Sequence, residues 1–478
     1  MTRESKTSYL VKNTGVLAIG TFSAKVLTFL LVPIYTAALT TAEYGSYDIV
    51  YSTCTLLVPI LTFNISEAML RFPLQEGSDV PRIARIGVVI TLLSGLLVLA
   101  GELLPGPWRG IDGYLWSAPL YLAYALYQEL LLLARGIERF KEVAVAGIVS
   151  SAGVIVLTVV FLFGLSAGLN GFYAANVLGM TLGCVYLLAR LRGVLFAKAS
   201  THGSDLARQM ILYSLPLCAA TVGWWLINTS GRYIVLYFCG ASENGLYSVA
   251  SKIPSILSVI ASVFIQAWQV SGIKEMEGDA AGGDDGFLLA VFDAAEALVV
   301  LFCSLLCLLA PTIARIMFSN EFYSAWEYVP LLLIYVVFNT MSGMWGPIFS
   351  ARYDTRPIAV STALAGIANI ALGIPLTFLF GVQGMAGASI FAGVVNWAWR
   401  GYKVRRHSNA DFHMGRSLAI YAALVAQAFI TISQLKSSVI LTSQLVVIVW
   451  LAWLFRRIVW KMIIAGLRLI KGRRRTDE

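Results

Sequence analysis

The sequence from Gln209 to Phe238 reads QMILYSLPLCAATVGWWLINTSGRYIVLYF. These 30 residues contain one charged side chain, Arg232. An apolar stretch of about 20 residues is long enough to cross the hydrocarbon core of a bilayer as a helix. A charge at that depth costs at least about 2.5–3.5 kcal/mol on insertion scales, so it normally faces a watery interior. The stretch therefore predicts a membrane helix with an inward-facing cation.

Similar apolar stretches recur through most of the 478 residues. Hydrophobic residues make up 58% of the chain and charged residues 13%, and the mean hydropathy is +0.77. A soluble domain carries about 25% charged residues. Because the apolar runs are long and continuous, they fit membrane helices rather than barrel strands. We therefore expect an all-α, polytopic membrane helical bundle.

The hydropathy pattern predicts about fourteen transmembrane helices. They lie near residues 14–38, 45–66, 86–104, 114–134, 143–165, 171–190, 209–238, 244–270, 287–310, 324–349, 357–380, 384–402, 416–434 and 438–456. We divide the chain into an N-terminal six-helix half (1–203), a C-terminal six-helix half (204–412) and a final segment (413–478). The final segment holds two additional helices and a basic tail.

The distribution of basic residues orients these helices. With the N-terminus inside, 29 of the 35 Lys and Arg residues fall in inside segments and three fall outside. The remaining three, Lys25, Arg232 and Lys252, lie within spans. This asymmetry indicates cytoplasmic N- and C-termini. The net charge of +9 is thus mainly a topology signal, and no nucleic-acid partner is expected.

Short motifs recur between the two halves in the same order. The matching pairs are EYGSY (43–47) with ENGLY (243–247), ARGIER (134–139) with ARYDTR (351–356), and GLNG (168–171) with GVQG (381–384). Membrane transporters are commonly built from internal repeats of this kind. The spacing of about 200–217 residues predicts two pseudo-symmetric halves that share one orientation.

Four helices carry polar side chains at helical spacing. The helices at 14–38, 45–66, 209–238 and 244–270 carry stripes that include Lys25, Thr28, Asp48, Ser52, Thr55, Cys218, Thr221, Trp225, Asn228, Arg232, Ser251, Lys252, Ser255, Ser258, Ser262, Gln266 and Gln269. The helices at 86–104, 416–434 and 438–456 show no such stripe. Repeat-equivalent polar faces predict one central cavity, although Ser and Thr in membrane helices also aid close packing.

This pattern gives a set of candidate binding residues. Lys25, Arg232 and Lys252 are expected to bind an anionic group, and Asn228, Gln266 and Gln269 to offer hydrogen bonds. Trp225 is a candidate to stack on a sugar face, with packing as the alternative. Asp48 is a possible coupling acid, or an ion-pair partner of Arg232 or Lys252.

Enzymatic and metal chemistry find no support in the sequence. The three histidines lie in loops, the six cysteines form no CxxC pair, and the predicted outer loops contain no paired carboxylates. We expect no metal, no cofactor and no catalytic activity. A transported anion accounts better for the interior cations.

Several segments resemble a known family. They include VKNT (11–14), FLLVPIY (29–35), YSLP (213–216), WW (224–225), RY (232–233) and AW (267–268). They are similar to Wzx-type polysaccharide flippases of the multidrug/oligosaccharidyl-lipid/polysaccharide exporter superfamily. The resemblance implies a MATE-like, V-shaped pair of bundles and flipping of undecaprenyl-pyrophosphate-linked oligosaccharide across the bacterial cytoplasmic membrane. It implies membrane lipids and the polymerase and export machinery of the same pathway as further partners.

One departure from the resemblance concerns coupling. Family members commonly carry an acid directly before the arginine that Arg232 matches, and this chain has Gly231 there. Two other functions of the same superfamily remain open. A cation-coupled multidrug exporter predicts buried acids, for which Asp48 is the best candidate. A lipid II flippase also uses a cationic interior.

Overall fold

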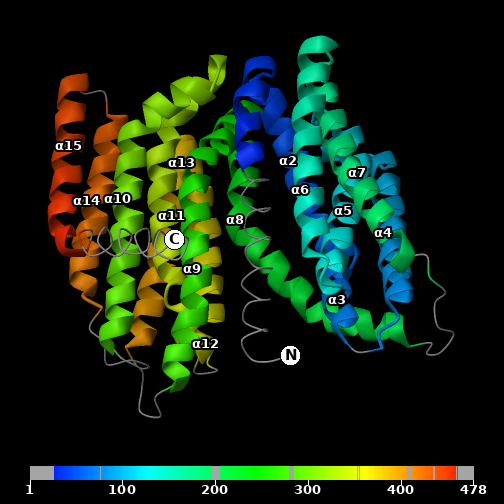
Figure 1. The fold of residues 1–478 in the computed structure, drawn as a ribbon. Helices are drawn as coiled ribbons and strands as arrows, with labels where there is room; N and C mark the ends of the chain where they lie inside the picture. The colour runs from blue at the N-terminus through cyan, green and yellow to red at the C-terminus, as the bar shows by residue number, and fades with distance from the viewer. Residues whose placement is uncertain are drawn as a thin grey trace, which may run out of the picture. The chain divides into compact units, whose positions relative to one another are not determined.

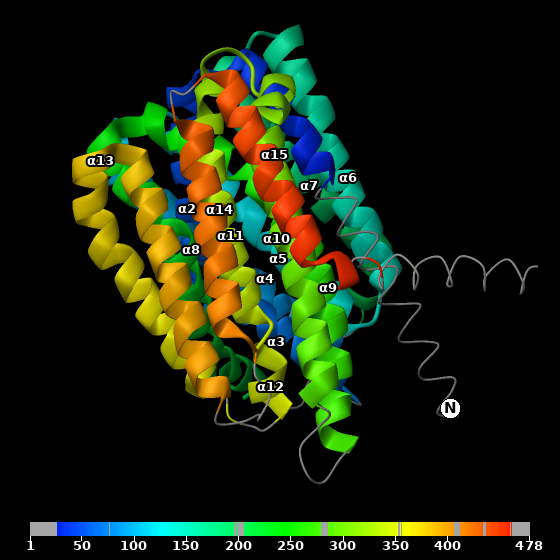
Figure 2. The ribbon, with the colours of Figure 1, turned by 90° about the vertical axis from the view of Figure 1, so that its left-hand side faces the viewer.

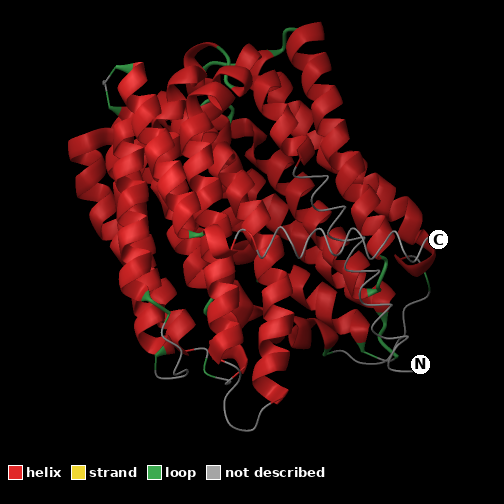
Figure 3. Ribbon diagram, turned by 60° about the vertical axis from the view of Figure 1, so that its left-hand side comes forward, coloured by secondary structure: helices red, strands yellow, loops and turns green. Residues whose placement is uncertain are grey.

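The computed structural model describes residues 26–75, 77–195, 197, 205–278, 285–351, 354, 356–405, 412–433, 436–458 and 460. Figure 3 shows that these residues form helices joined by loops. Eight described helices are long and apolar enough to cross a membrane, or nine if one bent pair counts as a single span. Each of the fourteen predicted ranges overlaps a described helix. The prediction of an all-α polytopic bundle is confirmed.

The chain forms two compact units. Unit 1 comprises Met1–Leu236, Gly240–Leu246 and Met317–Phe322. Its helices, shown in Figure 1, are Val26–Ala38, α2 (Thr41–Leu61), α3 (Ile65–Arg71), η1 (Phe72–Leu74), α4 (Val80–Leu103), η2 (Pro107–Gly110), η3 (Tyr114–Trp116), α5 (Ser117–Gly136), α6 (Phe140–Val159), the π-turn η4 (Val160–Gly164), α7 (Gly168–Leu195) and the larger part of α8 (Leu206–Ala250).

Unit 2 comprises Tyr237–Cys239, Tyr247–Ile316 and Tyr323–Glu478. Its helices are α9 (Lys252–Gly278), α10 (Asp285–Met317), most of η5 (Asn320–Tyr328), α11 (Val329–Gly343), α12 (Gly346–Ala351), α13 (Arg356–Val404), α14 (Met414–Ile432) and α15 (Ser437–Leu454). The division of the chain into two six-helix halves stays a prediction.

Two glycines bend the longest helices: α13 contains two of the predicted spans, whereas α8 contains the span at 209–238 and only the start of the span at 244–270. Gly240 in α8 has φ 88° and Gly381 in α13 has φ 61°. These positive φ values suit glycine, which has no Cβ to clash with the backbone. Figure 2 shows the two arms of α13 that meet at its bend.

Helix α2 has a well-defined start and a bent end. The Thr40 hydroxyl accepts from the backbone N–H of Glu43, and the Glu43 carboxylate accepts from the Thr40 N–H at 2.8 Å. This capping box satisfies two backbone donors that the first helical turn leaves open. After Leu61 the chain turns by 65° into α3, with Asn64 at φ 54°. The Asn64 side chain at this turn donates to Thr221 of α8 at 3.1 Å.

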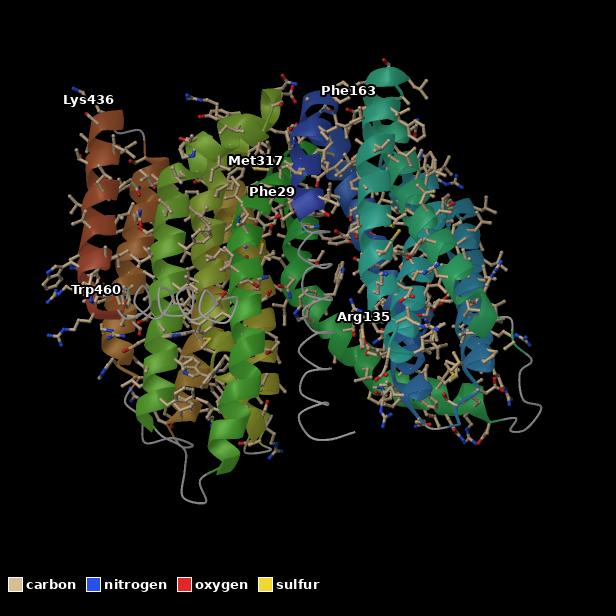
Figure 4. The ribbon with its side chains drawn as sticks, viewed as in Figure 1. Phe29, Arg135, Phe163, Met317, Lys436 and Trp460 are labelled. Atoms are coloured by element: carbon tan, nitrogen blue, oxygen red, sulfur yellow. The ribbon has the colours of Figure 1, made fainter. Side chains whose placement is uncertain are left out.

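Buried apolar side chains of α3, α4, α5 and α7 form the core of unit 1. This cluster includes Ile65, Met69, Ile83, Leu133 and Leu187. In Figure 4, Arg135 lies at one end of α5, whereas Phe163, in η4 directly after α6, lies at the opposite end of this helix pair. An apolar body with a basic residue at one end is the arrangement that the charge distribution predicts.

In unit 2, buried polar contacts attach α14 to α10. Arg416 of α14 pairs with Asp293 and, at 3.1 Å, with Glu296 of α10. The Tyr421 hydroxyl donates to Glu296 at 2.8 Å. Arg416 is the third residue of α14, so both acids of α10 are neutralised near the start of that helix.

A second polar network joins α10, α14 and α15. Gln427 of α14 bonds Ser304 of α10 at 2.8 Å and also bonds Gln444 of α15. All three side chains are buried. Interhelical amide contacts of this kind hold membrane helices together because lipid offers no competing partner. Lys436 and Trp460 lie at opposite ends of the α15 segment (Figure 4).

The start of α2 contacts residues 240–246 of α8, backbone against backbone. A Cβ on Gly45 would lie 1.9 Å from the Ala241 carbonyl oxygen, and one on Gly245 would lie 2.0 Å from the Thr41 carbonyl oxygen. The Thr41 and Ser242 hydroxyls are 2.7 Å apart. The two repeated motifs, EYGSY and ENGLY, therefore meet each other in unit 1. Only glycine permits so close an approach of the two backbones.

Candidate functional site

The charged centre of unit 1 is an ion pair between α8 and α2. An Nη1 hydrogen of Arg232 is donated to Asp48 Oδ1 at 2.8 Å, and Nη1 also lies 3.0 Å from the Ser52 hydroxyl. The Asp48 side chain is 5% exposed and that of Arg232 is 23% exposed. Buried charges are stable only when they are paired and hydrogen-bonded. The pair therefore explains how both charges persist in an apolar bundle.

Further polar contacts continue along the same two helices. The Tyr233 and Thr53 hydroxyls are 2.7 Å apart, and the Trp225 indole N–H donates to Thr55 at 3.1 Å. Nearer the end of α2, Cys218 contacts the Pro59 carbonyl oxygen, and the Asn64 amide donates to Thr221 at 3.1 Å. We call this row of contacts, from Asp48–Arg232 to Asn64–Thr221, the polar seam.

Most residues of the seam belong to the sequence-predicted stripes, whereas Thr53, Asn64 and Tyr233 do not. The sequence left the partner of Asp48 open, and the structure assigns Arg232 to it. This pairing compensates the Arg232 charge, so an anion would bind by displacing Asp48 or by sharing the guanidinium with it. Trp225 is buried, with its indole N–H bound to Thr55. In this conformation Trp225 packs within the seam and offers no open face for a sugar.

The other candidate residues lie elsewhere. Lys25 lies outside the described residues, as do the side chains of Gln266 and Gln269. Asn228 is exposed on α8, and its amide donates to the Trp224 carbonyl oxygen of the preceding turn at 2.8 Å. Lys252 is half-buried at the start of α9 in unit 2, where no described carboxylate of that unit pairs with it.

The serines of α9 bond mainly to their own helix. Ser255 donates to the Lys252 carbonyl oxygen at 2.5 Å, and Ser262 donates to the Val259 carbonyl oxygen at 2.7 Å. Back-bonding to the preceding turn satisfies a hydroxyl donor without any ligand. Each oxygen can still accept a hydrogen bond. The stripe is therefore compatible with a watery face but does not require a bound sugar.

Two buried groups escaped the sequence reasoning. Glu129 of α5 is 1% exposed and bonds Thr91 of α4. Its other carboxylate oxygen has no partner among the described residues. Arg400 of α13, counted among the inside loop residues, is 8% exposed. Sequence hydropathy places such residues along a helix but does not show which face packs inward.

Tyrosines surround the ion-pair end of the seam. The Tyr35 and Tyr44 rings stack at 4.4 Å, and Tyr47 lies 5.2 Å from Tyr173. All four side chains are buried. Their rings limit the access of water to the end of α2 that carries Asp48. No group of three or more His, Cys, Asp or Glu side chains among the described residues is arranged to hold a metal ion.

The chain is similar to known proteins in sequence and in fold. The model of a family described as "Polysaccharide biosynthesis protein" matches residues 10–269, a range that includes Asp48, Arg232 and Lys252. No curated protein sequence matches the chain.

Three solved structures share its fold. A lipid II flippase MurJ in an inward closed conformation has 13% identity and a TM-score of 0.61, covering 93% of this chain and 99% of that one. An inward-facing multidrug resistance MATE family transporter of the MOP superfamily has 14% identity and a TM-score of 0.56, covering 81% and 98%. A MOP superfamily transporter from Pyrococcus furiosus has 14% identity and a TM-score of 0.53, covering 83% and 95%.

The ion pair can be tested by a double-mutant cycle. Asp48→Asn leaves the Arg232 guanidinium without its carboxylate, and Arg232→Gln leaves Asp48 buried without a cation. We expect the double variant to lose less stability than the sum of the losses of the two single variants. The difference is the coupling free energy, which should be about 1–3 kcal/mol. The measurement is unfolding of the purified chain in detergent.

A matched control is Ser52→Ala, which removes a neutral partner of the same guanidinium and should cost less than Asp48→Asn. Additive effects of Asp48→Asn and Arg232→Gln would contradict the pairing.

Proposed function

We propose that this chain, which belongs to the polysaccharide biosynthesis protein family, is a flippase for undecaprenyl-pyrophosphate-linked oligosaccharide repeat units. The observation that carries the proposal is the ion pair of Arg232 with Asp48 inside an apolar unit. Ionisable residues at membrane depth usually mark a transport pathway. A guanidinium that one carboxylate already holds can exchange this anion for another.

The pyrophosphate is the anion that suits this exchange. Arginine binds phosphate oxygens through paired N–H donors, as it binds a carboxylate. When a pyrophosphate occupies Arg232, Asp48 loses its counter-charge, and like-charge repulsion loosens α2 from α8. We propose that substrate binding opens the polar seam in this way. Lys25 is proposed as a further cation for the second phosphate, and Lys252 of unit 2 is proposed separately as an anion-binding residue.

The glycan is proposed to contact polar groups beyond the phosphates. Asn228 is exposed on α8, one helical turn before Arg232, so its amide is placed to meet a group attached to a bound phosphate. Gln266 and Gln269 are proposed for the same role. A small number of such contacts suits a carrier, because tight binding of the glycan would slow its release.

The proposed location is the bacterial cytoplasmic membrane, with both termini in the cytoplasm. The excess of basic residues in the inside segments supports this orientation. Repeat units would then move from the cytoplasmic to the outer leaflet by alternating access. The polymerase and export machinery of the same surface polysaccharide would receive them.

Two alternatives have support of their own. One structural neighbour is a lipid II flippase, and lipid II is an alternative cargo for this chain. A cation-coupled exporter would use a buried acid, and Glu129, held by one neutral hydroxyl, is such an acid. The cargo is therefore what the first experiment must identify.

Deletion of the gene provides the assay for cargo and for the cations together. We expect a deletion strain to lose surface polysaccharide and to accumulate its lipid-linked repeat units, since synthesis continues while flipping stops. Arg232→Ala and Lys252→Ala should each restore flipping poorly, because each removes a proposed pyrophosphate ligand. Mass spectrometry of extracted lipids and quantification of surface glycan measure both effects.

The matched control is Arg139→Ala, whose side chain is 56% exposed and which should restore export fully. Membrane levels of each variant exclude loss of protein as the cause. Full export by the Lys25, Arg232 and Lys252 triple alanine variant would refute pyrophosphate binding by these cations. Accumulation of lipid II with intact surface polysaccharide would point to the alternative cargo.

The close contact at Gly45 and Gly245 predicts that a disulfide between α2 and α8 will block transport. We propose that α2 and residues 240–246 of α8 separate during each cycle. Because the Thr41 and Ser242 hydroxyls lie 2.7 Å apart, Thr41→Cys with Ser242→Cys places two thiols within reach of a disulfide. Oxidation should abolish flipping, and a reductant should restore it. Thr41→Cys alone and Ser242→Cys alone are the controls. Undiminished flipping with a complete disulfide would contradict movement at this contact.

A further inference from the structure

Arg400 in the second arm of α13 is a buried cation with only neutral partners. Its Nε donates to the Ser361 hydroxyl at 2.8 Å, Nη2 donates to the Thr362 hydroxyl at 2.9 Å, and Nη1 donates to the Ser342 carbonyl oxygen at 3.1 Å. No carboxylate among the described residues pairs with it. A charge that is 8% exposed normally has a counter-charge.

The end of α11 compensates only part of this charge. Ser342 lies in the last turn of α11, where the helix dipole contributes roughly half a negative charge. About half of the guanidinium charge therefore remains. A guanidinium has five N–H donors. Since three of them are used, two N–H groups on Nη1 and Nη2 stay available.

The surroundings of Arg400 contain more unused donors. The indole N–H groups of Trp345 and Trp397 and the Ser342 hydroxyl are buried without a partner among the described residues. The two indole rings lie 5.9 Å apart, and the six-membered ring of Trp345 packs against Gly401, where a Cβ would be 2.8 Å from Trp345 Cη2. One buried acceptor, Asn396 Oδ1, is also unpaired and can take one donor. Several donors still remain without an acceptor.

A negatively charged ligand whose atoms only accept hydrogen bonds would match the unused donors and the remaining positive charge of Arg400. Phosphate oxygens accept only, and they match the paired N–H groups of arginine. Arg400 lies one helical turn, about 6 Å, from the end of α13 at Val404. Lys403 and Arg405 follow at this end. Basic clusters at a helix end attract anionic lipid headgroups.

We propose that Arg400, with the indole N–H of Trp345, forms a binding site for the phosphate group of a membrane lipid. The site lies within unit 2, on α11, α13 and the turn before α12, whereas Asp48 and Arg232 belong to unit 1. It does not depend on the proposed cargo, because glycerophospholipids and isoprenoid pyrophosphates both present the same oxygens. A bound phosphate would complete the charge balance and join α11 to both arms of α13.

Native mass spectrometry of the purified full chain tests the site. The probes are phosphatidylglycerol, farnesyl pyrophosphate and, as a lipid without phosphate, diacylglycerol. We expect the wild-type chain to retain a phosphate-bearing lipid in preference to diacylglycerol. Arg400→Gln should weaken this binding about tenfold, and Trp345→Phe, which keeps the ring but removes the N–H, by a smaller factor of about three to five.

Controls separate binding from folding. Arg356→Gln neutralises an exposed arginine of α13 and should bind lipid as the wild type does. If Arg400→Gln fails to fold, Trp345→Phe decides, because its packing is nearly unchanged. Loss confined to phosphatidylglycerol assigns the site to glycerophospholipid, and loss confined to farnesyl pyrophosphate assigns it to an isoprenoid carrier. Equal retention of every phosphate lipid by wild type and Trp345→Phe would overturn the proposal and leave Arg400 as a cap on α11.

Discussion

Lipid offers no hydrogen bonds, so each polar group that this chain carries into the membrane must find its partner within the protein. The backbone meets this demand by forming helices. The side chains meet it through a few buried contacts between helices, of which Arg232 with Asp48 is the charged example in unit 1. In unit 2, Arg416 with Glu296 and Gln427 with Gln444 attach the two additional helices.

The same constraint explains why a paired cation can serve transport. Burying a guanidinium without a counter-charge is costly, and a permanently fixed pair would have no function beyond stability. Arg232 is 23% exposed, which leaves it accessible to a competing anion, whereas Asp48 is 5% exposed. Exchange is therefore proposed to occur at the arginine, with Asp48 as the internal anion that holds α2 and α8 together between cargoes.

Hydropathy and basic-residue counts were sufficient to predict the helices, because insertion into lipid depends on composition along one segment. Helical spacing also predicted the polar faces of α2 and α8 that form the seam. It could not select Arg232 over Lys252 as the partner of Asp48. It missed Gln427, Gln444 and Arg400, since an isolated polar residue in an apolar helix shows no periodicity. Only the packing of α10, α11, α13, α14 and α15 gives these residues partners.

Flipping by the purified chain is the most direct test of the central claim. Vesicles would carry the full chain and a labelled undecaprenyl-pyrophosphate-linked oligosaccharide, and an added glycosidase would trim only the glycans on the outer leaflet. The account predicts that vesicles with the wild-type chain lose nearly all of the protected label, whereas vesicles with Arg232→Ala retain it as protein-free vesicles do. Equal protection in wild-type and protein-free vesicles, with the chain folded and inserted, would contradict the account.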